Sequence, residues 1–293
     1  MSRIAYVNGR YVPHRQAAVH IEDRGYQFSD GVYEVIATVR GRLVDEEAHL
    51  QRLDRSLSAL RMRWPMTPAA LRFVVRELIR RNRLSGLGAI YLQITRGVAP
   101  RNHPFPAGVE PALVMTARPL PPFDVEAARR GVRVIALPDE RWKRPDIKSV
   151  SLLANVLAKQ QAVEAGAYEA WLVDDKGLIT EGTASNAWIV TRDGELVTRQ
   201  ADRAILNGIT RCALINLAGA HGVRLVERPF DIAEAQNAAE AFLTSTTSWL
   251  KAVVRIDDAV IGDGRIGPLS ERLLSSYVDR VAAIGAAASG TVR

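Results

Sequence analysis

The stretch DIKSV, residues 146–150, places a lysine where a short extended run meets an amphipathic pattern. Lys148 can therefore point into the space between a strand and a helix. A buried lysine loses its charge readily, and its neutral amine is a nucleophile that forms a Schiff base with a carbonyl group. The alternative is a surface lysine that pairs with a nearby acid, so Lys148 alone indicates little.

A second stretch, TEGTASN, contains a carboxylate that could act together with that amine in binding a cofactor. Glu181 lies between a strand pattern and a glycine-containing turn. An acid held against a heteroaromatic nitrogen keeps that nitrogen protonated, and pyridoxal 5'-phosphate (PLP) needs such a partner because its protonated ring is the electron sink. Taken by itself, Glu181 is better interpreted as an exposed acid in a plain turn.

Two hydroxyl-rich stretches, NGITR at 207–211 and TSTTS at 244–248, could bind a phosphate. The first places backbone N–H groups and the Thr210 hydroxyl at a helix start, which attracts anions. The second offers hydroxyls and amides where a strand runs into a turn. Ordinary capping explains either stretch alone, but both occur here with a candidate Schiff-base lysine.

The elements that must position these residues follow from hydrophobic spacing. Strands are predicted in IAYVNGRYV, EVIATVRGRLV, AIYLQIT, ALVMTA, GVRVIAL, EAWLVDD, AWIVTRDGELVT, RLVERPF and AFLTSTTS, with turns at Asn8-Gly9, Gly41 and Asp193-Gly194. Helices are predicted through the leucines at 50, 53, 57 and 60, from Thr67-Pro68 onward, over 151–164, and in ITRCALINLAGAHG and SERLLSSYVDRVAAI. Residues 152, 153, 156, 157 and 163 put apolar side chains on one side of the 151–164 helix.

The proline-rich run RPLPPFD, residues 118–124, has no periodicity and is predicted to link two domains. The predicted organisation is an N-terminal α+β domain at 1–117, a C-terminal domain at 125–286, and a frayed tail at 287–293. Both halves mix helices and strands. We expect antiparallel hairpins in them rather than βαβ units, which indicates an α+β fold class.

Composition narrows the class of protein. Hydrophobic residues make up 47% and charged residues 24%, which is typical of a globular chain. Cys212 is the only cysteine, so neither a disulfide framework nor a cysteine metal site is expected, and no metal site is predicted. The N-terminus lacks the apolar core of a signal peptide, and no run is long enough to span a bilayer. These features predict a cytoplasmic protein that does not bind membranes.

The net charge of +7 raises the question of nucleic-acid binding. The basic residues alternate with acids and apolar residues, as in ELIRRNRL, and no recognised binding motif accompanies them. We therefore expect solvated helix faces and a preference for anionic small molecules. A basic, non-catalytic binding protein stays an alternative, and it would bind oligonucleotides with a steep salt dependence.

Together, the stretches DRGYQFSDGVYE, DIKS, TEGTASN, ILNGITR and TSTTS resemble the fold-type IV PLP-dependent enzymes, and specifically their D-amino acid aminotransferases. The resemblance runs from residue 22 to at least residue 248. It implies two mixed α/β domains with PLP at the domain interface. It also implies a transferase that moves an amino group between a D-amino acid, such as D-alanine or D-glutamate, and a 2-oxo acid, 2-oxoglutarate or pyruvate.

The resemblance also implies roles for individual residues. Lys148 would hold PLP as a Schiff base and then move the substrate proton, and Glu181 would pair with the pyridine nitrogen. The residues implied for the rest of the cofactor are Arg52, Ile209, Thr210 and Thr246 at the phosphate, Leu206 against the ring, and Ser245 near the substrate side. One departure is Ala184, where relatives often carry a serine, so any hydrogen bond made by that serine is missing.

The loop ITRGVAPRNHPFP carries an R-x-H pair, Arg101 and His103. In D-amino acid aminotransferases this pair traps the substrate α-carboxylate together with the residue matching Tyr33. A guanidinium grips a carboxylate with two hydrogen bonds, and imidazole and phenol add others. The pair would reach into the neighbouring subunit's site, so the resemblance implies a homodimer. The same-fold alternatives are a branched-chain L-amino acid or (R)-amine aminotransferase and an aminodeoxychorismate lyase. They lack this R-x-H arrangement.

Overall fold

A computed structural model describes residues 3–287, which form two compact units. Within the described residues, unit 1 comprises residues 3–123, 147–151 and 281–287, and unit 2 comprises residues 124–146 and 152–280. The short segment that contains Lys148 thus groups with the N-terminal residues rather than with its sequence neighbours. The predicted domain boundaries stay a prediction, and the predicted frayed tail lies outside the described residues except for Ala287.

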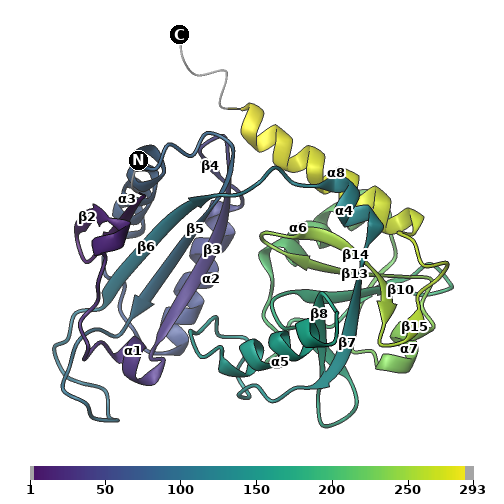
Figure 1. The fold of residues 1–293 in the computed structure, drawn as a ribbon, viewed down its shortest axis with the longest axis horizontal. Coiled ribbons are helices and arrows are strands. Elements are labelled where there is room, and N and C mark those ends of the chain that lie inside the picture. Colours follow the sequence, from purple (N-terminus) through teal and green to yellow (C-terminus); the bar gives the residue numbers. More distant parts are fainter. Residues whose placement is uncertain (1–2, 288–293) are drawn as a thin grey trace. The chain divides into compact units, whose positions relative to one another are not determined.

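Unit 1 contains a six-stranded sheet in the order β2-β1-β6-β5-β3-β4, drawn in purple and blue in Figure 1. Its strands are β1 (Ile4–Val7), β2 (Arg10–Pro13), β3 (Gly31–Val39), β4 (Arg42–Leu43), β5 (Leu87–Thr95) and β6 (Ala112–Pro119). Every neighbouring pair is antiparallel, as expected from the hairpin signals. Asn8 and Gly9 both have positive φ in the first turn, which confirms the predicted hairpin there.

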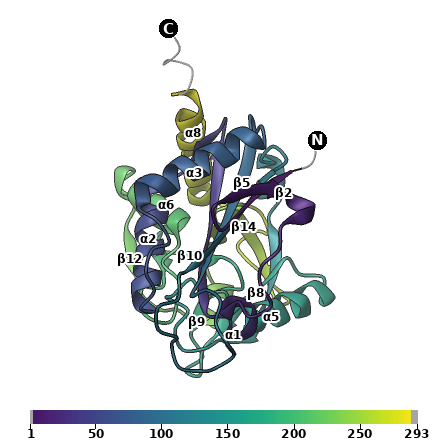
Figure 2. The same ribbon diagram turned by 90° about the vertical axis from the view of Figure 1, so that its left-hand side faces the viewer.

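Helices α2 (Glu46–Ala59) and α3 (Pro68–Arg81) pack against this sheet, as Figure 2 shows. Thr67 caps α3 by accepting a hydrogen bond from the Ala70 amide, with Pro68 as the first helical residue, as predicted. The shared core takes Leu53 and Leu57 from α2 and the alternate strand residues 90, 92 and 94 from β5. Odd-numbered residues of β3, including Tyr33, therefore face away from these helices. The shorter helices of this unit are η1 (His14–Gln16) and α1 (Arg24–Phe28).

Unit 2 is built on a nine-stranded sheet in the order β12-β11-β10-β13-β14-β7-β8-β9, with β15 paired to β14. Its strands are β7 (Val132–Pro138), β8 (Glu169–Val173), β9 (Ile179–Gly182), β10 (Asn186–Val190), β11 (Leu196–Thr198), β12 (Leu225–Glu227), β13 (Glu240–Ser245), β14 (Trp249–Ile256) and β15 (Ala259–Val260). Its helices are α4 (Val125–Arg130), α5 (Leu153–Glu164), α6 (Ile209–Ala220) and α7 (Ile232–Gln236). Helix α8 (Pro268–Ala286) lies in this unit up to Arg280.

The expectation of hairpins rather than βαβ units is wrong for unit 2. Strands β7 and β8 are parallel and connected through α5, and β11 and β12 are parallel and connected through α6. A parallel pair needs a crossover of a dozen or more residues, which these helices provide. The local patterns predicted these particular helices and strands but could not show which strand pairs with which.

Helix α5 forms over most of the predicted segment, but its apolar side is not in the core. Leu153, Val156, Leu157 and Val163 are exposed, by 51–73%, while Ala158 and Ala162 face inward. Small alanines allow the helix to lie close to β7 and β8. Periodicity therefore located the helix correctly, yet the larger apolar residues lie on its outer side.

Among residues 3–287, no helix has both the length and the apolar character needed to cross a membrane. The same part of the chain has no group of three or more His, Cys, Asp or Glu side chains that could hold a metal ion.

Candidate active site

Lys148 is held beside Tyr33 in unit 1. The Tyr33 amide donates to the Lys148 carbonyl at 3.0 Å, and the Val150 amide donates to the Gly31 carbonyl at 3.0 Å. These bonds attach the lysine segment to the start of β3. The Lys148 Nζ atom lies 4.4 Å from the centre of the Tyr33 ring, within range of a cation–π contact. The backbone thus holds the Lys148 segment against β3, with the amine next to the Tyr33 ring.

Arg52 extends from α2 into a buried polar cluster with Glu34. Its Nε and Nη2 atoms donate to the two Glu34 carboxylate oxygens at 2.8 and 2.7 Å. His49 completes the cluster, with Nδ1 2.7 Å from Glu34 Oε2. Burial raises the pKa of Glu34, but the charge and hydrogen bonds of Arg52 and the hydrogen bond of His49 outweigh it and bring the pKa to about 2. Glu34 therefore orients the guanidinium of the residue predicted to bind phosphate.

The ionisation of His49 follows from the same cluster. Its burial lowers the pKa of the imidazole below its usual value, although Glu34 acts in the opposite direction. The ring is therefore neutral at pH 7. Because a carboxylate only accepts hydrogen bonds, Nδ1 carries the proton and donates to Glu34.

Arg101 and His103 lie on an exposed loop beside the Phe28 ring. The Arg101 guanidinium is 4.6 Å and the His103 ring 5.3 Å from that ring's centre. The loop backbone is held by Arg24, whose Nη atoms donate to the carbonyls of Asn102 and His103 at 2.5 and 3.2 Å. The two predicted carboxylate-binding side chains are thus adjacent and point from an anchored loop.

Asp30 fixes Arg24 and also Arg96 at the base of this loop. Arg24 Nε and Arg96 Nε donate to Asp30 Oδ2 at 2.8 and 2.7 Å. Burial raises the pKa of Asp30, but hydrogen bonds from the two arginines reverse that effect and lower it. The carboxylate therefore stays ionised and bridges two buried cations, which ties Arg24 to Arg96 at the base of the loop.

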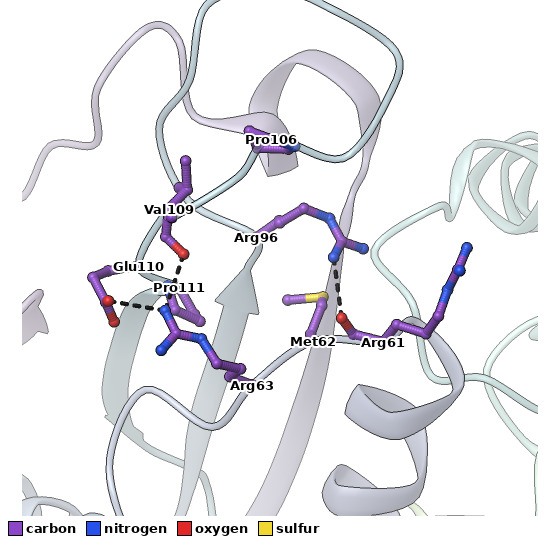
Figure 3. A pocket seen from close by; sticks show the side chains of 9 residues that line it. Arg61, Met62, Arg63, Arg96, Pro106, Val109, Glu110 and Pro111 are labelled. Carbon is purple, nitrogen blue, oxygen red and sulfur yellow. Dashed lines mark hydrogen bonds and ion pairs between the residues drawn. The ribbon is translucent and has the colours of Figure 1, made fainter.

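A cavity of about 350 Å³ lies next to that base, lined by residues 61–63, Arg96, Pro106 and residues 108–111. Figure 3 shows Arg63 bonded to Glu110 and Arg96 bonded to the Arg61 carbonyl across this cavity. None of the predicted site residues lines it. The cavity therefore lies at the base of the loop and is separate from the predicted site residues, including the two on that loop.

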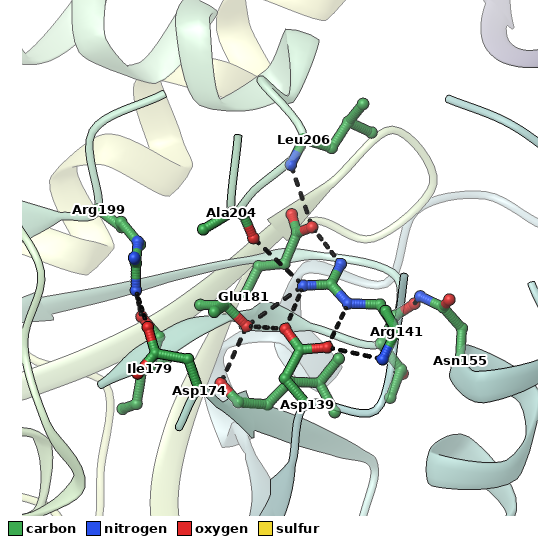
Figure 4. Close-up of polar contacts among 12 residues, drawn as sticks. Asp139, Arg141, Asn155, Asp174, Ile179, Glu181, Arg199, Ala204 and Leu206 are labelled. Carbon is green, nitrogen blue, oxygen red and sulfur yellow. Dashed lines mark hydrogen bonds and ion pairs between the residues drawn. The ribbon is translucent and has the colours of Figure 1, made fainter. Parts of the chain in front are cut away.

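In unit 2, Glu181 lies at the centre of a buried polar network, shown in Figure 4. Arg141 Nη1 donates to Glu181 Oε1 at 2.5 Å, while Arg141 Nη2 donates to Asp139 Oδ2 at 2.7 Å. The Arg141 and Glu181 side chains are each 6% exposed. Burial lowers the pKa of Arg141, but the charges of Glu181 and Asp139 outweigh it, so the pKa is raised. Glu181 is thus a buried, hydrogen-bonded carboxylate rather than an exposed acid in a turn.

The same carboxylate is tied to the segment that carries Leu206. The Leu206 amide donates to Glu181 Oε1 at 3.0 Å, and Asn186 Nδ2 donates to Glu181 Oε2 at 3.0 Å. Asn186 also donates to the Leu206 carbonyl at 2.9 Å. Leu206 and Glu181, predicted for the ring and its nitrogen, are therefore neighbours in unit 2.

The predicted phosphate-binding hydroxyls and amides lie at the ends of two elements of unit 2. Ile209 and Thr210 begin α6, which has Gly208 as its N-cap and no side-chain cap. The first N–H groups of a helix have no partner within the helix and attract anions. Ser245 ends β13 and Thr246 follows it in the turn, where Ser245 accepts from the Ser248 amide at 3.1 Å.

The turn that contains Ala184 is organised by a residue not identified from sequence. Buried Glu169 accepts hydrogen bonds from the Thr183 hydroxyl at 2.8 Å, the Ala184 amide at 2.6 Å and the Ser185 hydroxyl at 2.6 Å. Alanine at 184 therefore keeps its backbone bond to Glu169. The turn is fixed without a side-chain hydroxyl at that position.

Sequence reasoning also missed Glu34, His49, Asp139 and Arg141. Glu34 had a signal, because it shares the helix-facing side of β3 with Val32 and Ile36. An acid among apolar alternates indicates a buried partner. Arg141 had none, because it stands in the charged stretch PDERWKRP, where every arginine looks alike.

Comparison with known proteins places this geometry in a family. The model of the family "Amino-transferase class IV" matches residues 31–256. Among curated relatives, the D-alanine aminotransferase of Bacillus licheniformis is 41% identical over 274 residues, covering 94% of this chain and 95% of the relative. That of Staphylococcus haemolyticus is 38% identical over 275 residues, covering 93% and 95%.

Solved structures agree on the fold. The branched-chain amino acid aminotransferase of Escherichia coli superposes with a TM-score of 0.87 at 25% identity, covering 95% of this chain and 94% of that one. That of Thermobaculum terrenum, solved in its PLP form, superposes with a TM-score of 0.83 at 24% identity, covering 97% and 95%. The mixed α/β architecture of fold-type IV is therefore confirmed, and the chain belongs to the class IV aminotransferases.

Proposed function

We propose that this protein is a PLP-dependent D-amino acid aminotransferase that transfers an amino group to a 2-oxo acid in two half-reactions. The observation that carries the proposal is the fixed pairing of the Lys148 amine with Tyr33. The sequence identity of 37–41% to D-alanine aminotransferases supports a D-amino acid substrate over the branched-chain amino acids named for the solved structure at 25% identity.

The donor set fits PLP. Its chemistry requires an amine for the aldehyde, an acid for the pyridine nitrogen and cationic or N–H donors for the phosphate. We propose Lys148 for the first and Glu181 for the second. We propose Arg52, Ile209, Thr210 and Thr246 for the phosphate, Leu206 beside the ring, and Ser245 near the substrate. Oriented Arg52 and the start of α6 support the phosphate assignment.

When bound, PLP supplies a protonated ring that withdraws the electron pair left when the substrate Cα–H bond breaks. The protein's own task is to move that proton. With its amine free, Lys148 would take the proton from the substrate Cα and deliver it to C4′, the aldehyde carbon of the cofactor, on the other side of the shared nitrogen. Its attachment to β3 keeps the amine within reach during both transfers, which is an orientation effect.

The choice of enantiomer follows from where the substrate carboxylate is held. We propose that Tyr33, Arg101 and His103 bind it, so that the D-enantiomer presents its Cα–H to Lys148. Arg101 and His103 are exposed on an anchored loop. Their exposure supports the proposal that they serve the site of a second chain in a homodimer. We also propose a cytoplasmic location, in keeping with the single cysteine.

The decisive test is transamination by the purified protein with PLP, using D-alanine or L-leucine as donor and 2-oxoglutarate as acceptor. We expect turnover and bleaching of the cofactor's visible band with D-alanine alone. Reaction with L-leucine alone would favour the branched-chain alternative. Release of pyruvate from aminodeoxychorismate without an acceptor would favour the lyase, and a colourless protein that binds oligonucleotides would favour the non-catalytic alternative.

Replacing Arg101 with alanine is expected to raise KM for D-alanine by about 10- to 100-fold, the worth of a charge-assisted hydrogen bond. The value of kcat should change less, since Lys148 is untouched. Steady-state kinetics with D-alanine measures both. The matched control is Arg63→Ala, which removes another exposed arginine that pairs with Glu110. An unchanged KM in Arg101→Ala would remove Arg101 from carboxylate binding.

A further inference from the structure

Arg141 is a buried cation without an assigned role, and it contacts the acid proposed for the pyridine nitrogen. Its fork joins two carboxylates, Glu181 through Nη1 and Asp139 through Nη2, and Nε also donates to Asp139 at 2.9 Å. Arg141 thus donates two hydrogen bonds to Asp139 and one to Glu181. Asp139 therefore fixes the plane of the guanidinium, and the guanidinium in turn fixes one oxygen of Glu181.

A second set of contacts locks the same arrangement. The Thr180 hydroxyl donates to Asp139 Oδ2 at 2.7 Å, and Arg141 Nη2 donates to the Ala204 carbonyl at 3.3 Å. Thr180 and Glu181 are consecutive in β9, while Ala204 and Leu206 belong to the loop before α6. Figure 4 shows Arg141 between these two segments. One side chain thus ties the strand of the acid to the loop of Leu206.

The electrostatic effect of Arg141 has a definite direction. A neighbouring guanidinium favours the ionised form of a carboxylate, more strongly where water is excluded. A carboxylate accepts a hydrogen bond from a protonated pyridine nitrogen, whereas a protonated acid loses that charge-assisted bond. An arginine cannot give up its proton under ordinary conditions, so this influence is permanent.

We propose that Arg141, oriented by Asp139, is a positioning residue that keeps Glu181 ionised and aimed for the ring nitrogen of the cofactor. The inference rests on the proposed function, because it takes PLP as the ligand. It extends that function by naming a residue that makes the site selective for a ring that contains a basic nitrogen. An arginine with a purely structural role would affect the binding of a ring with the basic nitrogen and of a ring without it equally.

The test compares two ligands of the full-length apoprotein, namely PLP and its analogue with C–H in place of the ring nitrogen. Dissociation constants are measured by fluorescence titration, so turnover is not needed. We expect the wild type to prefer PLP by about 10- to 100-fold, as a hydrogen bond to a charged group would give. In Arg141→Met the preference should fall to less than about 3-fold, mainly through weaker binding of PLP.

Two further variants make the result unambiguous. Arg141→Gln keeps a donor for Asp139 but lacks the charge, so it tests the proposal even if Arg141→Met does not fold, and its preference should fall likewise. Arg199→Met removes another buried arginine of unit 2, which bonds to Asp174 at 3.0 Å and to the Ile179 carbonyl at 3.2 Å. It should lose stability and keep the wild-type preference.

The outcomes separate the inference from the proposed function. Wild-type preference retained in the Arg141 variants would overturn the role of Arg141, and so would a loss of preference in Arg199→Met of equal size. Lack of preference in the wild type would overturn it as well. The proposed function fails independently, if the wild type does not transaminate D-alanine.

Discussion

Replacing Lys148 with alanine lowers the transamination rate with D-alanine by at least about 10³-fold, within the usual range for removing a positioned acid–base group. The methyl group of alanine can neither attack an aldehyde nor carry a proton. The surrounding backbone should be unaffected, because Tyr33 and Val150 are tied to this segment through main-chain atoms. Single-turnover kinetics measures the loss, and mass spectrometry after borohydride reduction measures covalent attachment of the cofactor.

Lys143→Ala is the matched control for this variant. Lys143 stands five positions before Lys148, its side chain is 92% exposed, and it pairs only loosely with Asp175 at 3.3 Å. The control should keep full turnover and full covalent attachment. Turnover by Lys148→Ala within about tenfold of the wild type would show that another group moves the proton.

Replacing Glu34 with glutamine lowers the free energy of unfolding of the N-terminal unit by about 3–5 kcal/mol, the usual effect of removing one partner from a buried ion pair. The variant leaves the Arg52 guanidinium buried without its carboxylate and presents an amide to it. Urea denaturation monitored by hydrogen exchange in unit 1 measures the change. PLP affinity should fall in parallel, since Arg52 loses the group that orients it.

The stability supplied by Glu34 has a predictable pH dependence. Its pKa falls from an ordinary 4.5 to about 2 in the folded protein. A lowered pKa means that this stability is complete above pH 4.5 and is lost as pH falls from 4.5 toward 2. The difference between wild type and Glu34→Gln should therefore shrink over that interval.

Glu77→Gln is the control for Glu34→Gln. Glu77 also has a pKa of about 2, because of hydrogen bonds from Arg80 and Arg81, but it lies at the surface of α3. Water screens such pairs, so its loss should change stability little. An equally small effect in Glu34→Gln would show that burial adds nothing to the Glu34–Arg52 pair.

Local chemistry explains which elements could be predicted from sequence. Thr67 and Pro68 favour the start of a helix because they precede apolar residues at helical spacing. Asn8-Gly9 favours a tight turn because both residues adopt positive φ readily. Pairing and burial depend on distant residues instead. Parallel pairing of β7 with β8 and the outward side of α5 therefore could not be read from these stretches.

The candidate site was predictable to the extent that its residues stand in ordered motifs. Glu181 and Leu206 came from separate stretches, TEGTASN and ILNG, and the structure joins them by a hydrogen bond. Arg141 and Asp139 belong to no such motif, so only folding reveals that they meet Glu181. The assignment of individual residues to PLP or to substrate stays a proposal that the variants above address.

The five residues from Ile147 to Ser151 belong to unit 1, although the chain on both sides of them belongs to unit 2. Regions of a protein open locally in cooperative groups, and hydrogen-bonded neighbours open together. Lys148 should therefore share the opening equilibrium of β3 rather than that of α5, which follows it directly in sequence. Fluctuations that fray α5 would leave the amine in place, whereas those that loosen the first residues of β3 would release the amine and Tyr33 together.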